Sequence, residues 1–417
     1  MLFASTLTAL VLLSAHLAPV AARDHHHDSH PAAHDEAARA KPRSFEIKVN
    51  VPLKRDFLNA DGTINEARVK RAVDHQRQRH RRRPANSLET LTDVERKIQA
   101  DLFKRAQELE QDYNANKAKS VSKNAGASPA PLIADGYQWG TDVHFGDRTK
   151  SKGQRLTLFL DTLDYSTFVA KIGCLTGGTP YNPSKSPTTA DRKTSYSDKE
   201  IGQGYRYEDT LSIGDFTIPK QGFIAIDKPG GNQSLEDVLF YRSTFSGVLG
   251  LGRNPPSIHP RVLNPVENLH KSGAIHQSLY AVKITDEGGA LHIGSIDHNS
   301  YVGNMVWAPL LDTNDWHIPI DGWLFGSSSV LKPKTQSALV FSTTNGLISI
   351  PRSTARALFQ VKTDEELPFD RATSLYYHPC DNLRNEYWGF SVRDQVFKFP
   401  LSSLKLAGEP SCARAKS

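Results

Sequence analysis

The chain has 417 residues, which is long enough for two or more domains with cores of their own. Hydrophobic residues make up 38% of it, and the formal net charge is +6. A charge this small over so long a chain does not indicate a protein built to bind nucleic acid. The three cysteines allow one disulfide and leave one thiol over.

Residues 1–22 are typical of a secretory signal peptide. An apolar stretch from Leu7 to Leu17 is followed by small residues just before Arg23. The stretch is too short to span a bilayer, and no later apolar run approaches the roughly 18 residues of a membrane helix. The sequence therefore predicts a secreted, extracellular protein in an oxidising compartment, with no membrane partner.

Residues 23–134 form a basic and polar leader. Histidines cluster near its start, and a tract of this kind can bind transition metals. It builds no fixed coordination sphere, however, so we interpret it as a solvated, disordered tail and predict no metal site. The histidines are His25, His26, His27, His30 and His34.

Two further features of the leader suggest a pro-segment. Residues from Ser44 to Leu53 alternate between apolar and polar side chains, which predicts one half-buried strand. The basic run from Arg77 to Arg83 has three interpretations: a solvated face, a site for a protease that cleaves at paired basic residues, or a patch for acidic partners. We favour a processing site within a pro-segment, because the run lies between the signal peptide and the globular part.

The leader is predicted to end in a helix and a linker. Thr92–Glu95 is a capping box that opens an amphipathic helix with an apolar face running to Leu109. Lys117–Pro131 is rich in small and polar residues, which is typical of a linker. The globular part is predicted to start near Ile133.

From Gly136 onward, short β-like runs alternate with turn residues. This spacing favours an all-β sandwich or barrel over alternating strands and helices. Val262–Ser272 is the exception and is predicted to be a short helix that ends before Gly273. The predicted strands are Tyr137–Val143, Arg155–Leu160, Thr210–Ile213, Gly222–Ile226, Gly247–Leu251, Leu279–Ile284 and Ala290–Ile293.

One predicted strand carries the candidate chemistry. The apolar run Leu156–Leu160 ends in Asp161, and the hydroxyl residue Thr162 follows at once. A carboxylate at the tip of a buried strand is where a fold can fix an acid or a base. The plain alternative is a strand that ends in an ordinary aspartate turn. Which one holds depends on whether the rest of the chain supplies a partner.

Several short stretches in the right order resemble the pepsin-like aspartic peptidases. Asp161-Thr162 resembles the first catalytic motif of that family, and Gly202-Gln203-Gly204 resembles the glycines of its active-site flap. The other matching stretches are Gly136–Val143, Phe168-Val169, Tyr181–Ser184, Asp209–Gly214, Phe245–Gly252, Leu291–Asp297, Tyr301–Gly303 and Trp307–Pro309. Together they cover about residues 135 to 412.

The resemblance implies a bilobal all-β fold with an active-site cleft between two similar lobes. It places an N-terminal lobe at residues 135–308 and a C-terminal lobe at 309–417. It also implies a monomer that takes an extended peptide or protein in the cleft and uses no cofactor. The family's mechanism needs two facing carboxylates, one ionised as base and one protonated as acid, a dyad for which pepsin is the standard example.

The second carboxylate of that dyad is missing from the expected place. The stretch Ser337–Pro351 resembles the second catalytic motif, and we expect Phe341 at the position of the second aspartate. In this alignment Ser342 keeps the scaffold hydroxyl that matches Thr162, Thr343 replaces a glycine, and Gly346 is a one-residue insertion. Phenylalanine can neither accept nor donate a proton. Asp312, Asp315 and Asp321 lie nearby in sequence, but they fall on a different predicted strand.

Two more departures agree with this. Leu163 replaces the glycine that follows Asp161-Thr162, and its side chain should crowd the site. Ile201 stands just before Gly202, where the family has a tyrosine in the flap whose other glycine matches Gly204.

The resemblance also implies a disulfide between Cys380 and Cys412. It leaves Cys174 unpaired or buried. The family continues for about forty residues beyond the second of these cysteines, so the C-terminal lobe is expected to be incomplete, through real truncation or a wrong gene boundary. Asn232 begins an Asn-x-Ser glycosylation sequence.

These observations predict a secreted pepsin-like aspartic peptidase homologue that is catalytically inactive or severely impaired. We expect it to act by binding a peptide or protein. Two alternatives remain open. One is an active aspartic endopeptidase that works at acid pH with a non-standard or partner-supplied second acid, and the other is a degenerate product or truncated gene model.

Overall fold

The computed structural model describes the globular part of the chain and short pieces of the leader. The described residues are 44–46, 59, 65–70, 128–135, 138–148, 152–174, 178–198, 201–229, 244–253, 263–285, 288–301, 305–308, 310, 316–325, 337–344, 348, 350, 352–359, 366, 368–370, 375–376, 387–393 and 395–400.

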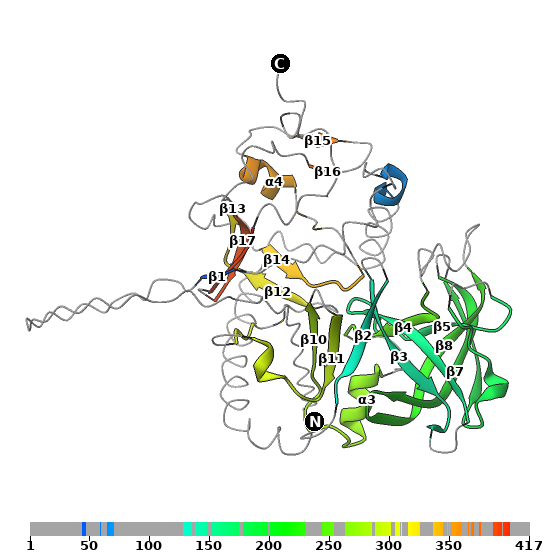
Figure 1. Cartoon of the computed structure of the whole chain (residues 1–417). Coiled ribbons are helices and arrows are strands. Elements are labelled where there is room, and N and C mark those ends of the chain that lie inside the picture. The colour runs from blue at the N-terminus through cyan, green and yellow to red at the C-terminus, as the bar shows by residue number, and fades with distance from the viewer. Residues whose placement is uncertain are drawn as a thin grey trace, which may run out of the picture.

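Six strands in the first half of the globular part close into a barrel (Figure 1). Neighbouring strands follow the order β3-β4-β9-β5-β8-β7, and β3 also pairs with β7. The predicted all-β barrel is therefore confirmed for this half. The strands are β3 (Gln138–Phe145), β4 (Gln154–Asp161), β5 (Phe168–Ala170), β7 (Gly202–Ile213), β8 (Phe216–Pro229) and β9 (Gly247–Gly250).

Four more strands extend this sheet to ten. β2 (Ala130–Asp135), β11 (Gly288–Ile293) and β10 (Tyr280–Thr285) continue it beyond β3, and β6 (Ala190–Asp198) pairs with β7. The edge strand β6 is polar and mostly exposed, and its register shifts between Asp191 and Ser195. Charged side chains and a bulge keep such an edge from pairing with another chain.

The strand predictions hold, with longer strands in the hairpin of β7 and β8. The sequence indicated Thr210–Ile213 and Gly222–Ile226, whereas the strands run Gly202–Ile213 and Phe216–Pro229. The two strands pair along almost their whole length. Pairing with a long neighbour extends a strand beyond its apolar run, and apolar runs are what sequence patterns detect.

The helix α3 (Pro265–Lys271) confirms the predicted short helix with tighter bounds. Asn264 is its N-cap, and a capping box joins Asn264 to Glu267 in both directions. Pro265 occupies the first helical position, where its missing N–H costs nothing. Gly273, just past the end, has a φ of 75°, a conformation that glycine adopts without strain.

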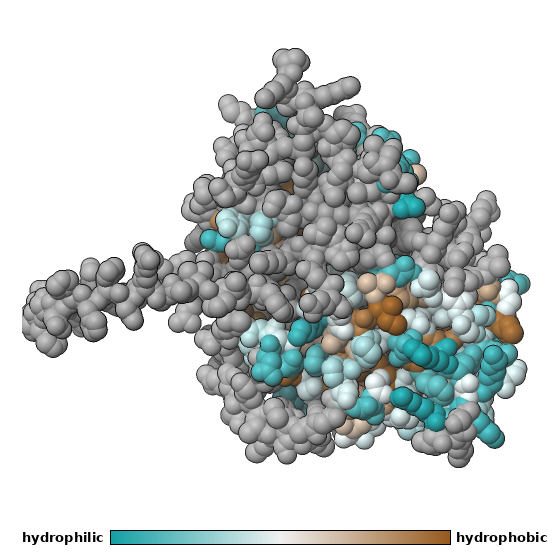
Figure 2. Space-filling model, in the orientation of Figure 1, coloured by the Kyte–Doolittle hydropathy of each residue, from teal (hydrophilic) through white to brown (hydrophobic). Residues whose placement is uncertain are grey.

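Aromatic side chains fill the barrel core. Tyr181 is fully buried and lies edge-on to Phe145 and Phe223, with ring centroids 5.3 and 5.0 Å apart. A second cluster on the other side of β4 contains Phe159, Phe168, Ile201 and their neighbours. Figure 2 shows mostly hydrophilic residues over the visible face of this region, with a small hydrophobic patch near its middle.

The second half of the globular part forms smaller sheets beside the barrel (Figure 1). Its core contains the buried aromatic residues Trp323, Trp388, Phe390 and Phe399. Its elements are β12 (His317–Ile320), β13 (Gly322–Phe325), β14 (Ser337–Val340), α4 (Arg352–Phe359), β15 (Phe369–Asp370), β16 (Leu375–Tyr376), β17 (Tyr387–Val392) and β18 (Gln395–Pro400), while the short 3-10 turns η3 (Pro183–Lys185) and η5 (His298–Ser300) belong to the first half.

The leader contributes one strand to the second half. β1 (Ser44–Glu46) pairs in parallel with β18, with Phe45 opposite Phe397. It lies within the strand predicted from Ser44 to Leu53. The signal peptide, the histidine tract, the basic run, the helix from Thr92 to Leu109, Asn232, Cys380 and Cys412 lie outside the described residues.

Cys174 is a free, buried cysteine, as expected. Its Sγ lies 3.1 Å from the carbonyl oxygen of Ile226. Burial, and then the negative charge of Asp227, raise the pKa of the thiol, which lowers the fraction of reactive thiolate.

We therefore expect maleimide to modify Cys174 at least about tenfold more slowly in the native protein than in urea at pH 8. Peptide mapping by mass spectrometry identifies the modified residue, and Cys174→Ser supplies the blank. Equal rates in the two conditions would contradict the buried, protonated thiol.

Candidate active site

Asp161 is the last residue of β4, at the tip of a strand that is buried over most of its length. The residue itself is 0% exposed. Its Oδ1 accepts hydrogen bonds from the backbone N–H groups of Leu163 and Asp164, at 2.8 and 3.0 Å. Backbone donors of this kind stabilise a carboxylate charge without a cation. The strand-tip aspartate predicted from sequence is therefore found, and it is enclosed by its own loop.

The backbone of Asp161 is fixed by the neighbouring strand β9. The Leu251 N–H, just past β9, donates to the Asp161 carbonyl at 2.8 Å. At Gly250, a Cβ atom would lie 2.5 Å from the carbonyl oxygen of Ser166. Only glycine fits such an approach, so β9 packs directly against the loop that follows Asp161.

Two aromatic side chains donate hydrogen bonds to the carbonyl of Leu251. The Leu251 carbonyl accepts from the Tyr280 hydroxyl at 3.2 Å and from Trp316 Nε1 at 3.1 Å. Burial, and then the charge of Asp161, raise the pKa of Tyr280. Trp316 precedes β12 in the second half, yet it packs within the barrel core. Neither residue was singled out from the sequence, because nothing in a linear pattern shows that both reach one carbonyl.

A reciprocal set of hydrogen bonds joins residues 161–164, which we name the Asp161 loop, to residues 341–344, which we name the Ser342 loop. Thr162 Oγ1 donates to the Phe341 carbonyl at 2.9 Å, and Thr343 Oγ1 donates to the Leu160 carbonyl at 2.7 Å. Each hydroxyl also accepts the other threonine's backbone N–H, at 3.2 and 3.3 Å. The four bonds relate the two loops by an approximate twofold symmetry.

This symmetry corrects the sequence-based register by one residue. Thr162 matches Thr343, so Phe341 matches Leu160 and Ser342 matches Asp161. The expectation that Phe341 corresponds to the aspartate and Ser342 to the scaffold hydroxyl is therefore wrong on this geometry. A run of Ser-Thr-Thr offers adjacent hydroxyls, and sequence alone could not tell which one faces the other loop. The expected insertion at Gly346 lies outside the described residues.

The local geometry of Ser342 repeats that of Asp161. Ser342 Oγ accepts the N–H of Thr344, two residues on, at 3.3 Å, just as Asp161 Oδ1 accepts the N–H of Leu163. It also lies 3.1 Å from Thr344 Oγ1. Ser342 is half-buried. The position that matches Asp161 therefore carries a hydroxyl, which donates one hydrogen bond but is not an acid in the physiological range.

Leu163 and Thr344 match each other in the same symmetry, and both are buried. The sequence placed Leu163 at the glycine of the first motif and Thr343 at the glycine of the second. In the symmetry of the two loops, Thr344 rather than Thr343 corresponds to Leu163.

The glycines that resemble the family's flap lie at the start of β7, in the hairpin that β6 and β7 form. Asp198 pairs with Gly202 across the turn, and both Gly202 and Gly204 lie within β7. A Cβ on Gly204 would lie 2.1 Å from the Ala225 carbonyl oxygen, so this glycine allows β7 to approach β8. Ile201 is buried in the cluster with Phe159 and Phe168.

Asp164 is an acid near the site that was not singled out from the sequence. Its N–H donates to Asp161 Oδ1, while its own Oδ1 accepts the N–H of Ser166 at 3.0 Å. The spacing of two carboxylates three residues apart was visible in the sequence. Asp321 donates its N–H to the Ser391 carbonyl, and Asp312 and Asp315 lie outside the described residues.

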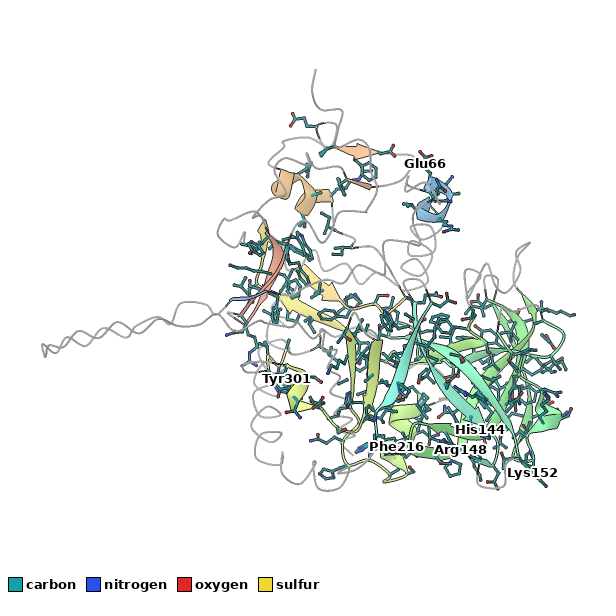
Figure 3. The ribbon with its side chains drawn as sticks, viewed as in Figure 1. Glu66, His144, Arg148, Lys152, Phe216 and Tyr301 are labelled. Atoms are coloured by element: carbon teal, nitrogen blue, oxygen red, sulfur yellow. The ribbon has the colours of Figure 1, made fainter. Side chains whose placement is uncertain are left out.

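Basic side chains gather at the opposite end of β4. Figure 3 shows His144, Arg148 and Lys152 together near the turn between β3 and β4. Asp161 closes the far end of β4. Within the described ranges, His, Cys, Asp and Glu side chains form no group of three or more that could hold a metal ion.

The fold and the site define a β-barrel protein with a strand-tip aspartate and paired threonine loops. The chain matches the eukaryotic aspartyl protease family over residues 141–414. It belongs to that family.

Individual relatives are distant. Gastricsin from Cavia porcellus is 28% identical over 259 residues, which cover 59% of this chain and 62% of that protein. Rhizopuspepsin-2 from Rhizopus niveus is 28% identical over 264 residues, or 60% of this chain and 64% of that protein. The matched part therefore spans less than two thirds of either relative. Among the described residues, no helix is long and apolar enough to cross a membrane.

Proposed function

We propose that this chain is a secreted, pepsin-like member of its family that binds extended peptides or proteins without cutting them. The observation that carries the proposal is the hydrogen-bonded symmetry of the two loops, which supports a correspondence between Ser342 and Asp161. The family's chemistry needs two carboxylates that share one proton. A serine hydroxyl supplies a donor but does not ionise near pH 4, so it cannot share a proton as a second carboxyl group does.

The enclosure of Asp161 supports the same proposal. A catalytic carboxylate must reach a water molecule and a substrate carbonyl. Asp161 is 0% exposed, and its Oδ1 already accepts two backbone N–H groups. The threonine bonds that join the two loops are present, which supports a binding role for the chain. Loss of one member of a catalytic pair typically removes most of the activity.

A peptide library gives a direct test. Immobilised full-length chain, untreated or nicked by trypsin in its basic run, is incubated with the library between about pH 3 and 7. Eluted peptides are then identified by mass spectrometry. We expect retained peptides that are intact. Cleaved peptides, whose formation is blocked by a statine peptide and lost in Asp161→Asn, would overturn the proposal. Failure to retain any peptide would overturn the binding role.

The alternative is an active acid endopeptidase, and Asp164 is the described residue that favours it. Asp164 lies in the same loop as Asp161 and contacts it through its backbone N–H. If cleavage is observed, this alternative expects Asp164→Asn to abolish it, because the second acid would then be gone. Cleavage that survives Asp164→Asn but not Asp161→Asn would require a second acid from elsewhere in this chain or from a partner chain.

A further inference from the structure

The Ser342 loop presents an uncharged hydroxyl where its symmetry mate presents a carboxylate. Ser342 Oγ accepts one N–H from Thr344 and lies beside Thr344 Oγ1. A hydroxyl has one proton to donate and two lone pairs to accept with. The Ser342 proton can therefore turn between Thr344 Oγ1 and a ligand. Asp161, by contrast, is sealed from solvent behind its loop.

We infer that Ser342 recognises an uncharged carbonyl or hydroxyl group of an extended peptide, and that this recognition does not change between pH 5 and 8. The inference rests on the proposed binding function and specifies its ligand chemistry. The buried carboxylate of Asp161 disfavours an anionic group beside Ser342, because like charges repel strongly where water is scarce. A neutral acceptor matches the single O–H donor.

The pH independence follows from what Ser342 replaces. A pair of carboxyl groups loses its last donor when both ionise, and close like charges separate their pKa values. A serine hydroxyl keeps its proton throughout this range. The site therefore contains one buried carboxylate and one hydroxyl that is always a donor. A pair of carboxyl groups offers the same acceptor and donor only while one of them is ionised and the other is protonated.

The titratable groups that the described contacts place near the two loops come from three elements. Asp161 and Asp164 belong to the Asp161 loop. Tyr280 of β10 feels the charge of Asp161, and its raised pKa keeps it uncharged up to pH 8 and beyond. His317 of β12 pairs with Val340, two residues before Ser342. Histidine is the side chain that ordinarily titrates in this window, so His317 needs its own control.

The test measures binding of an uncleavable peptide with a central statine residue, by calorimetry, at pH 5, 6.5 and 8. Full-length wild type is compared with Ser342→Asp, Ser342→Ala and His317→Gln. We expect the wild-type dissociation constant to vary less than about threefold. In Ser342→Asp a second carboxylate faces Asp161, so affinity should fall at least about tenfold as pH rises from 5 to 8 and that donor ionises. Ser342→Ala should weaken binding about equally at every pH.

Each outcome decides a different point. A wild-type pH dependence that persists in His317→Gln overturns the inference and leaves the binding proposal standing. A dependence that disappears in His317→Gln belongs to that histidine and supports the hydroxyl site. Unchanged affinity in Ser342→Ala overturns the contact itself. If the wild type binds no peptide at any pH, while its cooperative thermal transition shows that it is folded, the proposed function is overturned as well as the inference.

Discussion

Thr343→Val should lower the free energy of unfolding by about 2–4 kcal/mol, whereas Ser342→Ala should lower it by about 1 kcal/mol. Thr343 Oγ1 donates to the Leu160 carbonyl and accepts the Thr162 N–H. Valine has the same shape but leaves both backbone groups without that partner. Leu160 is 0% exposed and Thr162 is 1% exposed, so water cannot replace the lost bonds.

Chemical denaturation followed by circular dichroism measures the difference. Thr162→Val is the symmetric counterpart and should cost about as much as Thr343→Val, because it removes the bond to the Phe341 carbonyl and the bond from the Thr343 N–H. A loss in Ser342→Ala that equals or exceeds the loss in Thr343→Val would restore the sequence-based register and contradict the correspondence of Ser342 to Asp161.

Asp209→Ala should destabilise the barrel even more, by about 4 kcal/mol or above. Asp209 is 1% exposed and lies in β7. Its carboxylate accepts hydrogen bonds from the hydroxyls of Tyr181, Ser186, Thr188 and Thr189 and from the N–H of Thr210. Alanine removes the acceptor from all of these buried or partly buried donors at once, and an unpaired buried donor carries its full desolvation cost.

A partly exposed aspartate, Asp142, serves as the control that distinguishes the loss of this buried network from the loss of any carboxylate. Asp142 pairs with Arg155, whose side chain is 73% exposed, and it also accepts the Thr157 hydroxyl. Exposed pairs contribute little, so Asp142→Ala should cost about 1 kcal/mol. Asp209→Asn, which keeps one acceptor oxygen, should fall between the two alanine variants. Equal midpoints for Asp209→Ala and Asp142→Ala would contradict the buried network.

Much of the barrel was predictable from sequence, for local reasons. Short apolar runs separated by turn residues predicted its strands, and Asn264 with Glu267 set the start of α3 through a cap that forms within four residues. Tyr181–Ser184 and Asp209–Gly214 were each found as separate stretches. That Tyr181 and Asp209 are hydrogen-bonded to each other across 28 positions was not visible in either.

The candidate site also has one feature that the sequence predicts and another that depends on tertiary contacts. Asp161 was predictable, because an apolar run that ends in a carboxylate is a local pattern. Its burial depends on residues from other elements. The Leu251 N–H donates to the Asp161 carbonyl, and the side chains of Tyr280 and Trp316 donate to the Leu251 carbonyl. No sequence pattern couples these positions.

The sequence by itself determined that this is a β-barrel protein of the aspartic peptidase kind, with an aspartate at a strand tip and no Asp-Thr-Gly in the second stretch. Only the tertiary structure decided which residue of the second loop corresponds to that aspartate. Phe341, Ser342 and Thr343 are adjacent in the chain, so a pattern can slip by one among them. The hydrogen bonds between loops some 180 residues apart admit a single register, because each threonine must reach the carbonyl before its partner's strand tip.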